Sequence, residues 1–171
     1  MGSGLVYRPV AMTDTWTIPL EFMEPIPGAP VFGGVPRLEF IDGKDWLLSN
    51  DVWYRDALGN TYKMTARTIG GRPQRFVTDG GTIPPWAWPI VGHPMDDLFP
   101  AYLLHDWLWA HRPGDMTMEQ TNDRLNESLR VMGCKTWRRE AIMIAVYSPT
   151  ARRMWRDVKP LEYHYAPCRE G

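Results

Sequence analysis

Residues 99–110 read Phe-Pro-Ala-Tyr-Leu-Leu-His-Asp-Trp-Leu-Trp-Ala. At about 100° per residue, the apolar side chains of this stretch point to every side of a helix, and a helix that is apolar all round must be buried all round. His105 and Asp106 are the polar exceptions at its centre. Because an unpaired buried carboxylate is strongly destabilising, we expect Asp106 to have a partner: a metal, a cation or a set of hydrogen-bond donors.

The part of the chain before this stretch is predicted to form strands and loops. Proline and glycine are dense between residues 15 and 41, which excludes long helices there and indicates a proline-rich arm over residues 23–36. The clearest pattern is a hairpin, in which aromatic and β-branched residues flank a Gly-Asn turn. We predict strands at residues 16–18, 37–41, 52–56, 61–65 and 75–78.

The part after residue 96 is predicted to be helical. Thr117 and Gln120 form a capping box, Gly133 suits the position after a helix end, and Ser148-Pro149 breaks a helix. We predict helices over residues 98–111, 117–132, 136–147 and 151–158.

This order of elements predicts an α+β fold, with N-terminal antiparallel β hairpins, or a small sheet, packed against a C-terminal bundle of three to four helices. The length suits one domain over residues 1–171. We divide it into a proline-rich β and loop half (1–92), a helical half (96–158) and an irregular tail (159–171).

Composition excludes several classes of protein. The formal net charge of -1 argues against a nucleic-acid binder that works through bulk charge, and the arginines near residues 138 and 152–156 are expected to form a solvated helix face. Cys134 and Cys168 are too few for a zinc ribbon or a disulfide framework, so we expect free thiols. No stretch resembles a signal peptide or a membrane span, which predicts synthesis in the cytoplasm.

Three polar residues form the candidate site. Asp79 follows a predicted strand and precedes two glycines, while His105 and Asp106 lie on the buried helix. A nitrogen ligand and two carboxylates suit Zn, Mn or Mg, or a general acid and base, so these three are the candidate catalytic and metal-binding residues. The alternative is structural, with Asp79 holding its own turn, Asp106 anchoring that turn and His105 satisfied in the core.

Other polar residues are assigned supporting or surface roles. Thr82 adds a hydroxyl to the turn after Asp79. On the helix after the capping box, wheel geometry places Asn122 at the edge of the apolar stripe and Asp123 nearly opposite it. We expect Asn122 to face the cleft if either does. The remaining histidines show no ligand spacing and are expected on the surface or in loops, at positions 93, 111 and 164.

Two motifs together resemble a known family. Residues 76–84 read Phe-Val-Thr-Asp-Gly-Gly-Thr-Ile-Pro, and residues 103–108 read Leu-Leu-His-Asp-Trp-Leu. Over residues 45–150 the chain resembles the family called domain of unknown function 1353, whose members are encoded mainly by tailed bacteriophages and prophages. Here Gly81 and Thr82 replace the family's usual Ala-Ser. The family's Ala-Asp step matches Thr121-Asn122-Asp123, where either Asn122 or Asp123 corresponds to the family's Asp, and the third carboxylate is present only if Asp123 does.

Three functional hypotheses follow. The first is a virion-associated structural protein of a tail or baseplate, whose partners are other phage structural proteins or further copies of itself. It would be made in the host cytoplasm and incorporated into the particle. The second is a metal-dependent hydrolase for cell-wall or nucleotide substrates, with Asp79, His105 and Asp106 as its site. The third is a host-takeover protein that binds a bacterial target. The first needs no complete catalytic set, and we favour it.

Overall fold

Antiparallel strands precede the helices in the computed structural model, which describes residues 29–42, 45–69, 71–79, 92–93, 96–157 and 164–167. The fold is α+β, as the sequence predicts. The predicted strand at residues 16–18 lies outside the described residues.

One sheet is built on the predicted hairpin. Strands β4 (Val52–Arg55) and β5 (Thr61–Met64) pair with Val52 opposite Met64 and Tyr54 opposite Tyr62. The even-numbered residues of both strands are buried and the alternate ones are largely exposed, so one face of the hairpin packs on the core.

Strand β1 (Val31–Gly33) pairs with the other edge of β4 and completes a three-stranded sheet in the order β1-β4-β5. The proline-rich arm expected over residues 23–36 therefore contains an edge strand. Gly33 is required there because a Cβ at this position would lie 1.9 Å from the indole ring of Trp53.

A second sheet has the order β2-β3-β7-β6, and β8 also pairs with β7. Its strands are β2 (Leu38–Asp42), β3 (Asp45–Leu48), β6 (Arg67–Ile69), β7 (Arg72–Thr78) and β8 (Tyr165–Pro167). The sequence did not predict β3, β6 or β8. The expectation of an irregular tail is wrong at residues 165–167, where β8 gains its hydrogen bonds from β7, far away in the sequence.

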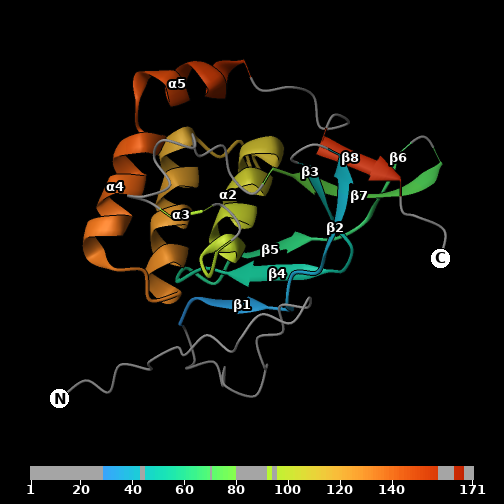
Figure 1. Ribbon diagram of the computed structural model, residues 1–171, viewed down its shortest axis with the longest axis horizontal. Helices are drawn as coiled ribbons and strands as arrows, with labels where there is room; N and C mark the ends of the chain where they lie inside the picture. The colour runs from blue at the N-terminus through green and yellow to red at the C-terminus, as the bar shows by residue number, and fades with distance from the viewer. Residues whose placement is uncertain are drawn as a thin grey trace.

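The helices lie beside the sheets, with α3 between α2 and α4 and α5 across their ends (Figure 1). Their bounds are Phe99–His111 for α2, Met118–Val131 for α3, Thr136–Val146 for α4 and Pro149–Arg156 for α5. The predicted capping box at Thr117 and Gln120 is present. None of the described helices is long and apolar enough to cross a membrane.

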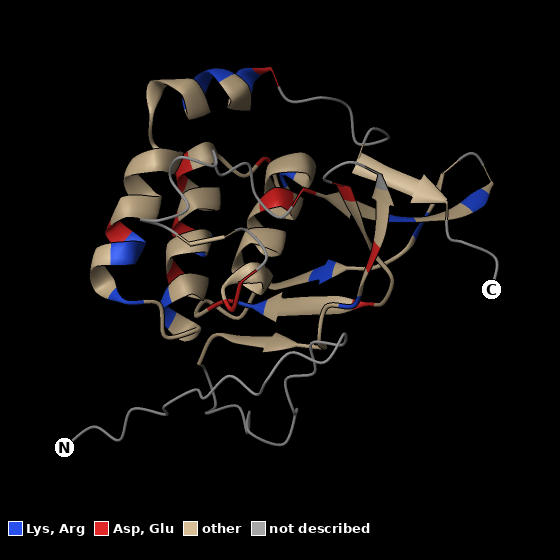
Figure 2. Ribbon diagram, in the orientation of Figure 1, with Lys and Arg blue, Asp and Glu red and all other residues tan. Residues whose placement is uncertain are grey.

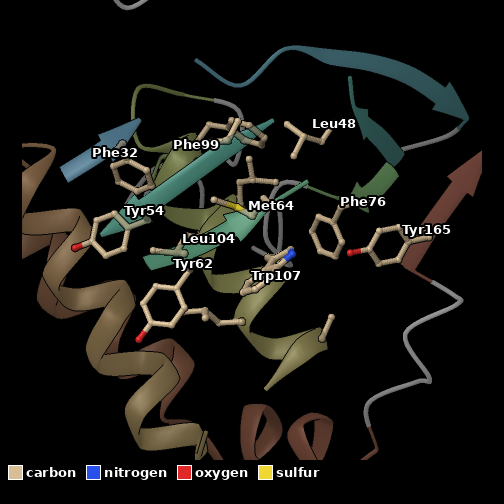
Figure 3. Close-up of a cluster of buried hydrophobic side chains, with 14 residues drawn as sticks. Phe32, Leu48, Tyr54, Tyr62, Met64, Phe76, Phe99, Leu104, Trp107 and Tyr165 are labelled. Atoms are coloured by element: carbon tan, nitrogen blue, oxygen red, sulfur yellow. The ribbon is translucent and has the colours of Figure 1, made fainter. Parts of the chain in front are cut away.

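Helix α2 is the centre of the core, as its sequence predicts. Side chains on all sides of it are buried, because β7 and the hairpin cover one side and α3 covers another. Aromatic residues from the sheets meet α2 in one cluster, seen in Figure 3 around Met64, Leu104 and Trp107. A second cluster joins α2 to α3 and α4 through Leu98, Leu125 and Ile142, among others.

Candidate functional site

His105 and Asp106 contact opposite neighbours of α2. His105 Nε2 lies 2.9 Å from the Oδ1 atom of Asn122 on α3. Asp106 Oδ2 accepts a hydrogen bond of 2.5 Å from the Thr78 hydroxyl at the end of β7. Adjacent helical residues point about 100° apart, so the two side chains serve two separate contacts between elements.

The contact with Asn122 determines which ring nitrogen of His105 carries the hydrogen. Asn122 Nδ2 donates to the carbonyl oxygen of Val146 at 3.2 Å, which leaves Asn122 Oδ1 as an acceptor facing His105. His105 Nε2 must therefore carry the hydrogen. Burial lowers the pKa of His105 to about 4, and the hydrogen bond with Asn122 offsets part of that effect. His105 is accordingly neutral near pH 7 and ties α2 to α3 and α4.

Thr78, Asp79 and Asp106 lie at the junction between β7 and α2. Thr78 is buried as the last residue of β7, and the half-buried Asp79 follows it directly. Asp106 is half-buried and holds Thr78. The sequence predicted that Asp106 needs a partner, and the Thr78 hydroxyl is one, contributed by the residue before the expected turn.

The two polar candidates on α3 differ in burial, as the helical wheel predicts. Asn122 is fully buried and faces His105, whereas Asp123 is exposed. Thr82 and the turn residues after Asp79 lie outside the described residues. Within the described part of the chain, no three His, Cys, Asp or Glu side chains are grouped as a metal ion would require. A metal site formed by Asp79, His105 and Asp106 stays a prediction.

The expectation that His111 lies on the surface or in a loop is wrong. It is half-buried in the last turn of α2. Its Nδ1 donates to the Trp107 carbonyl at 2.7 Å, so its Nε2, also at 2.7 Å, accepts from the Tyr165 hydroxyl on β8. Burial lowers the pKa of His111 to about 4. Sequence spacing missed this contact because Tyr165 belongs to the tail.

A buried charged cluster, formed by Asp56, Arg124 and Glu127, was also missed. Asp56 is 1% exposed and lies 3.0 Å from Arg124 Nε, and Arg124 also pairs with Glu127 at 3.4 Å. Glu127 accepts a hydrogen bond of 2.6 Å from the Tyr54 hydroxyl. Burial raises the pKa of Asp56, but the hydrogen bonds from Asn60 and the charge of Arg124 outweigh it and hold that pKa below its usual value.

This charged cluster connects the hairpin to α3. Asp56 also accepts backbone hydrogen bonds from Leu58 at 2.9 Å and from Asn60 at 2.8 Å, which shape the turn between β4 and β5. Acids at a Gly-Asn turn are common in loops, so no local signal marks this one as buried. The cluster fixes the position of α3, and with it the position of Asn122.

Comparison with known proteins assigns the chain to a family. Residues 46–146, from β3 to the end of α4, match the family model described as Protein of unknown function (DUF1353). The match includes Thr78, His105, Asp106 and Asn122. No curated protein and no solved structure matches the chain. Because the match covers more than half of the chain, the protein belongs to the family described as Protein of unknown function (DUF1353).

Proposed function

We propose that the protein is a virion-associated structural component of a bacteriophage tail or baseplate, which packs against a neighbouring subunit through the α4 outer face, defined as Trp137, Ile144 and Ala145. The observation that supports this proposal is the exposure of two large apolar side chains on this helix. Trp137 is 55% exposed and Ile144 is 75% exposed. They lie seven residues apart, which places them two turns apart on one side of α4.

Exposed apolar residues scattered singly are normal, but two on one helix face indicate a contact surface. Tryptophan is enriched in protein interfaces because it buries a large area at a small cost in conformational entropy. The inward side of α4 already packs on α3 through Ile142, which is 4% exposed. Among the described residues, neither buried hydrophobic cluster includes a residue of the α4 outer face.

The polar residues of the candidate site also favour a structural role. His105 is bonded to Asn122 and Asp106 to Thr78, so each stabilises a junction between elements. The phage origin comes from the resemblance described above. The hydrolase and the host-takeover protein stay alternative hypotheses.

The test is incorporation into particles. We expect mass spectrometry of purified virions to detect the protein, and Ile144→Glu to reduce its incorporation at least tenfold while its thermal unfolding temperature stays the same. Leu58→Glu is the matched control, because Leu58 is also 75% exposed but lies on the hairpin turn. Absence of the wild-type protein from purified particles would refute the proposal, as would equal incorporation of the Ile144→Glu variant.

A further inference from the structure

A groove of about 790 Å³ lies between α5 and the connection from α2 to α3. Its lining includes Arg112, Asp115, Met118 and Glu119 on one side, and Arg152, Trp155 and Arg156 from α5 on the other. The groove thus holds three guanidinium groups against two carboxylates, a local excess of positive charge in a chain whose net charge is -1. Figure 2 shows the basic residues of α5 on the helix that crosses the ends of the others.

Arg112 is a half-buried cation with no carboxylate partner among the described residues. Its guanidinium lies 3.7 Å from the centre of the Trp155 ring, and its Nη2 donates to the Trp155 carbonyl oxygen. Its Nε is buried without an acceptor, and among the described residues no carboxylate forms an ion pair with it. Burial lowers the pKa of Arg112. A half-buried guanidinium in this state is stabilised by an anion that approaches from the groove.

Arg152 and Arg156 are available to the same anion. They lie one helical turn apart, so their side chains project to the same side of α5. Arg152 makes an ion pair of 3.6 Å with Glu119, but both side chains are more than half exposed. Such pairs contribute little stability and exchange readily for another carboxylate.

We propose that the groove binds an acidic segment of a partner protein, in an extended conformation with carboxylates on alternate residues. Alternate side chains of an extended chain repeat at roughly 6.6 Å, close to the spacing of about 5–6 Å between Arg152 and Arg156 on their helix. The indole of Trp155 and the thioether of Met118 suit an apolar residue between the two acids. These apolar groups favour a peptide over a free inorganic anion.

The inference is independent of the proposed virion role, because the groove and the α4 outer face share no residue. Its test is calorimetric titration of the full chain, at low salt, with a peptide of sequence Ala-Glu-Leu-Glu-Ala. We expect saturable binding, and at least tenfold weaker binding to the double variant R152Q/R156Q. The peptide with Gln in place of both Glu residues should not bind.

Two controls distinguish binding in the groove from a non-specific attraction between the basic residues of the protein and the acidic peptide. The double variant R130Q/R153Q removes the same charge from residues outside the groove lining and should bind the peptide as the wild type does. Inorganic phosphate at the peptide concentration should not displace the peptide. The proposal is overturned if the wild type does not bind the acidic peptide, if the two double variants lose equal affinity, or if phosphate displaces the peptide.

Discussion

His105 and Asp106 differ in their neighbours although they are adjacent in the sequence. His105 is enclosed by α3 and by Trp109, whose ring centre lies 5.3 Å from its own, and it is almost completely buried. Asp106 is half-buried and reaches the end of β7. Removing a histidine from water disfavours its charged form, whereas the Asp106 carboxyl at the edge of the core accepts a hydrogen bond from Thr78. The two adjacent residues therefore make two separate contacts, one inside the core and one at its edge.

The stability of the protein should depend on pH through His105. Its pKa is about 4 in the folded protein, below the ordinary value of 6.5. A group with a lowered folded pKa stabilises the fold fully above its unfolded pKa and loses that contribution as the pH falls towards the folded value. We expect His105 to remove about 3 kcal/mol from the free energy of unfolding between pH 6.5 and pH 4, as measured by urea denaturation.

Substitutions of single histidines separate the contribution of His105 to this pH dependence from that of the others. His111 titrates in the same range, so the wild type should show the sum of both histidines. His105→Gln keeps a hydrogen-bond donor for Asn122 but cannot titrate, and it should lose less stability on acidification. His93→Gln is the matched control, because it alters an exposed histidine outside the contacts of α2. Parallel pH profiles for His105→Gln and the wild type would contradict the assignment.

At the scale of elements, α3 is positioned by contacts on two sides. Asp56 and the hairpin hold it through Arg124, and α2 holds it through His105 and Asn122. In Figure 3 the hydroxyl groups of Tyr54 and Tyr62 point away from the apolar cluster towards this region. Removing one partner of a buried ion pair leaves an uncompensated charge, which destabilises far more than the pair itself stabilises.

Asp56→Ala should therefore lower the free energy of unfolding by about 3–5 kcal/mol, because Arg124 would lose its nearer partner and keep only the 3.4 Å pair with Glu127. Asp51→Ala is the matched control: Asp51 pairs with Arg75 at 2.8 Å, but its side chain is 63% exposed. The control should cost less than about 1 kcal/mol. Urea denaturation measures both, and similar losses would show that burial does not govern these pairs.

At the scale of the molecule, the polar groups inside the fold join its elements. Asp106 joins α2 to β7, His105 joins α2 to α3, and His111 joins α2 to β8. All three lie on α2, which is buried on every side. This use of α2 as a common support explains why its sequence mixes three polar residues with an otherwise apolar surface.

Because His105 and Asp106 diverge, we expect divalent metals to leave the stability of the whole protein unchanged. A metal that binds the folded state raises its unfolding temperature by mass action. Addition of Zn, Mn or Mg, or of EDTA, should therefore not shift the thermal unfolding temperature measured by calorimetry. A rise with one of these metals, reversed by EDTA and abolished in Asp79→Asn, would instead support the predicted metal site.

The sequence by itself determined the features that depend on local physics. The hairpin, the capping box at Thr117 and the all-round apolar helix α2 follow from turn chemistry, backbone hydrogen bonding and periodicity. Wheel geometry likewise separated the buried Asn122 from the exposed Asp123.

Tertiary structure alone decided which polar groups are joined. The bonds from Thr78 to Asp106, from Asp56 to Arg124 and from His111 to Tyr165 span 28, 68 and 54 positions in the sequence. No local sequence pattern encodes such pairs. Water hydrates each polar group in the unfolded chain, and the two groups need one another only when packing excludes water from both. For the same reason β8 could be identified only in the folded structure, where it pairs with β7.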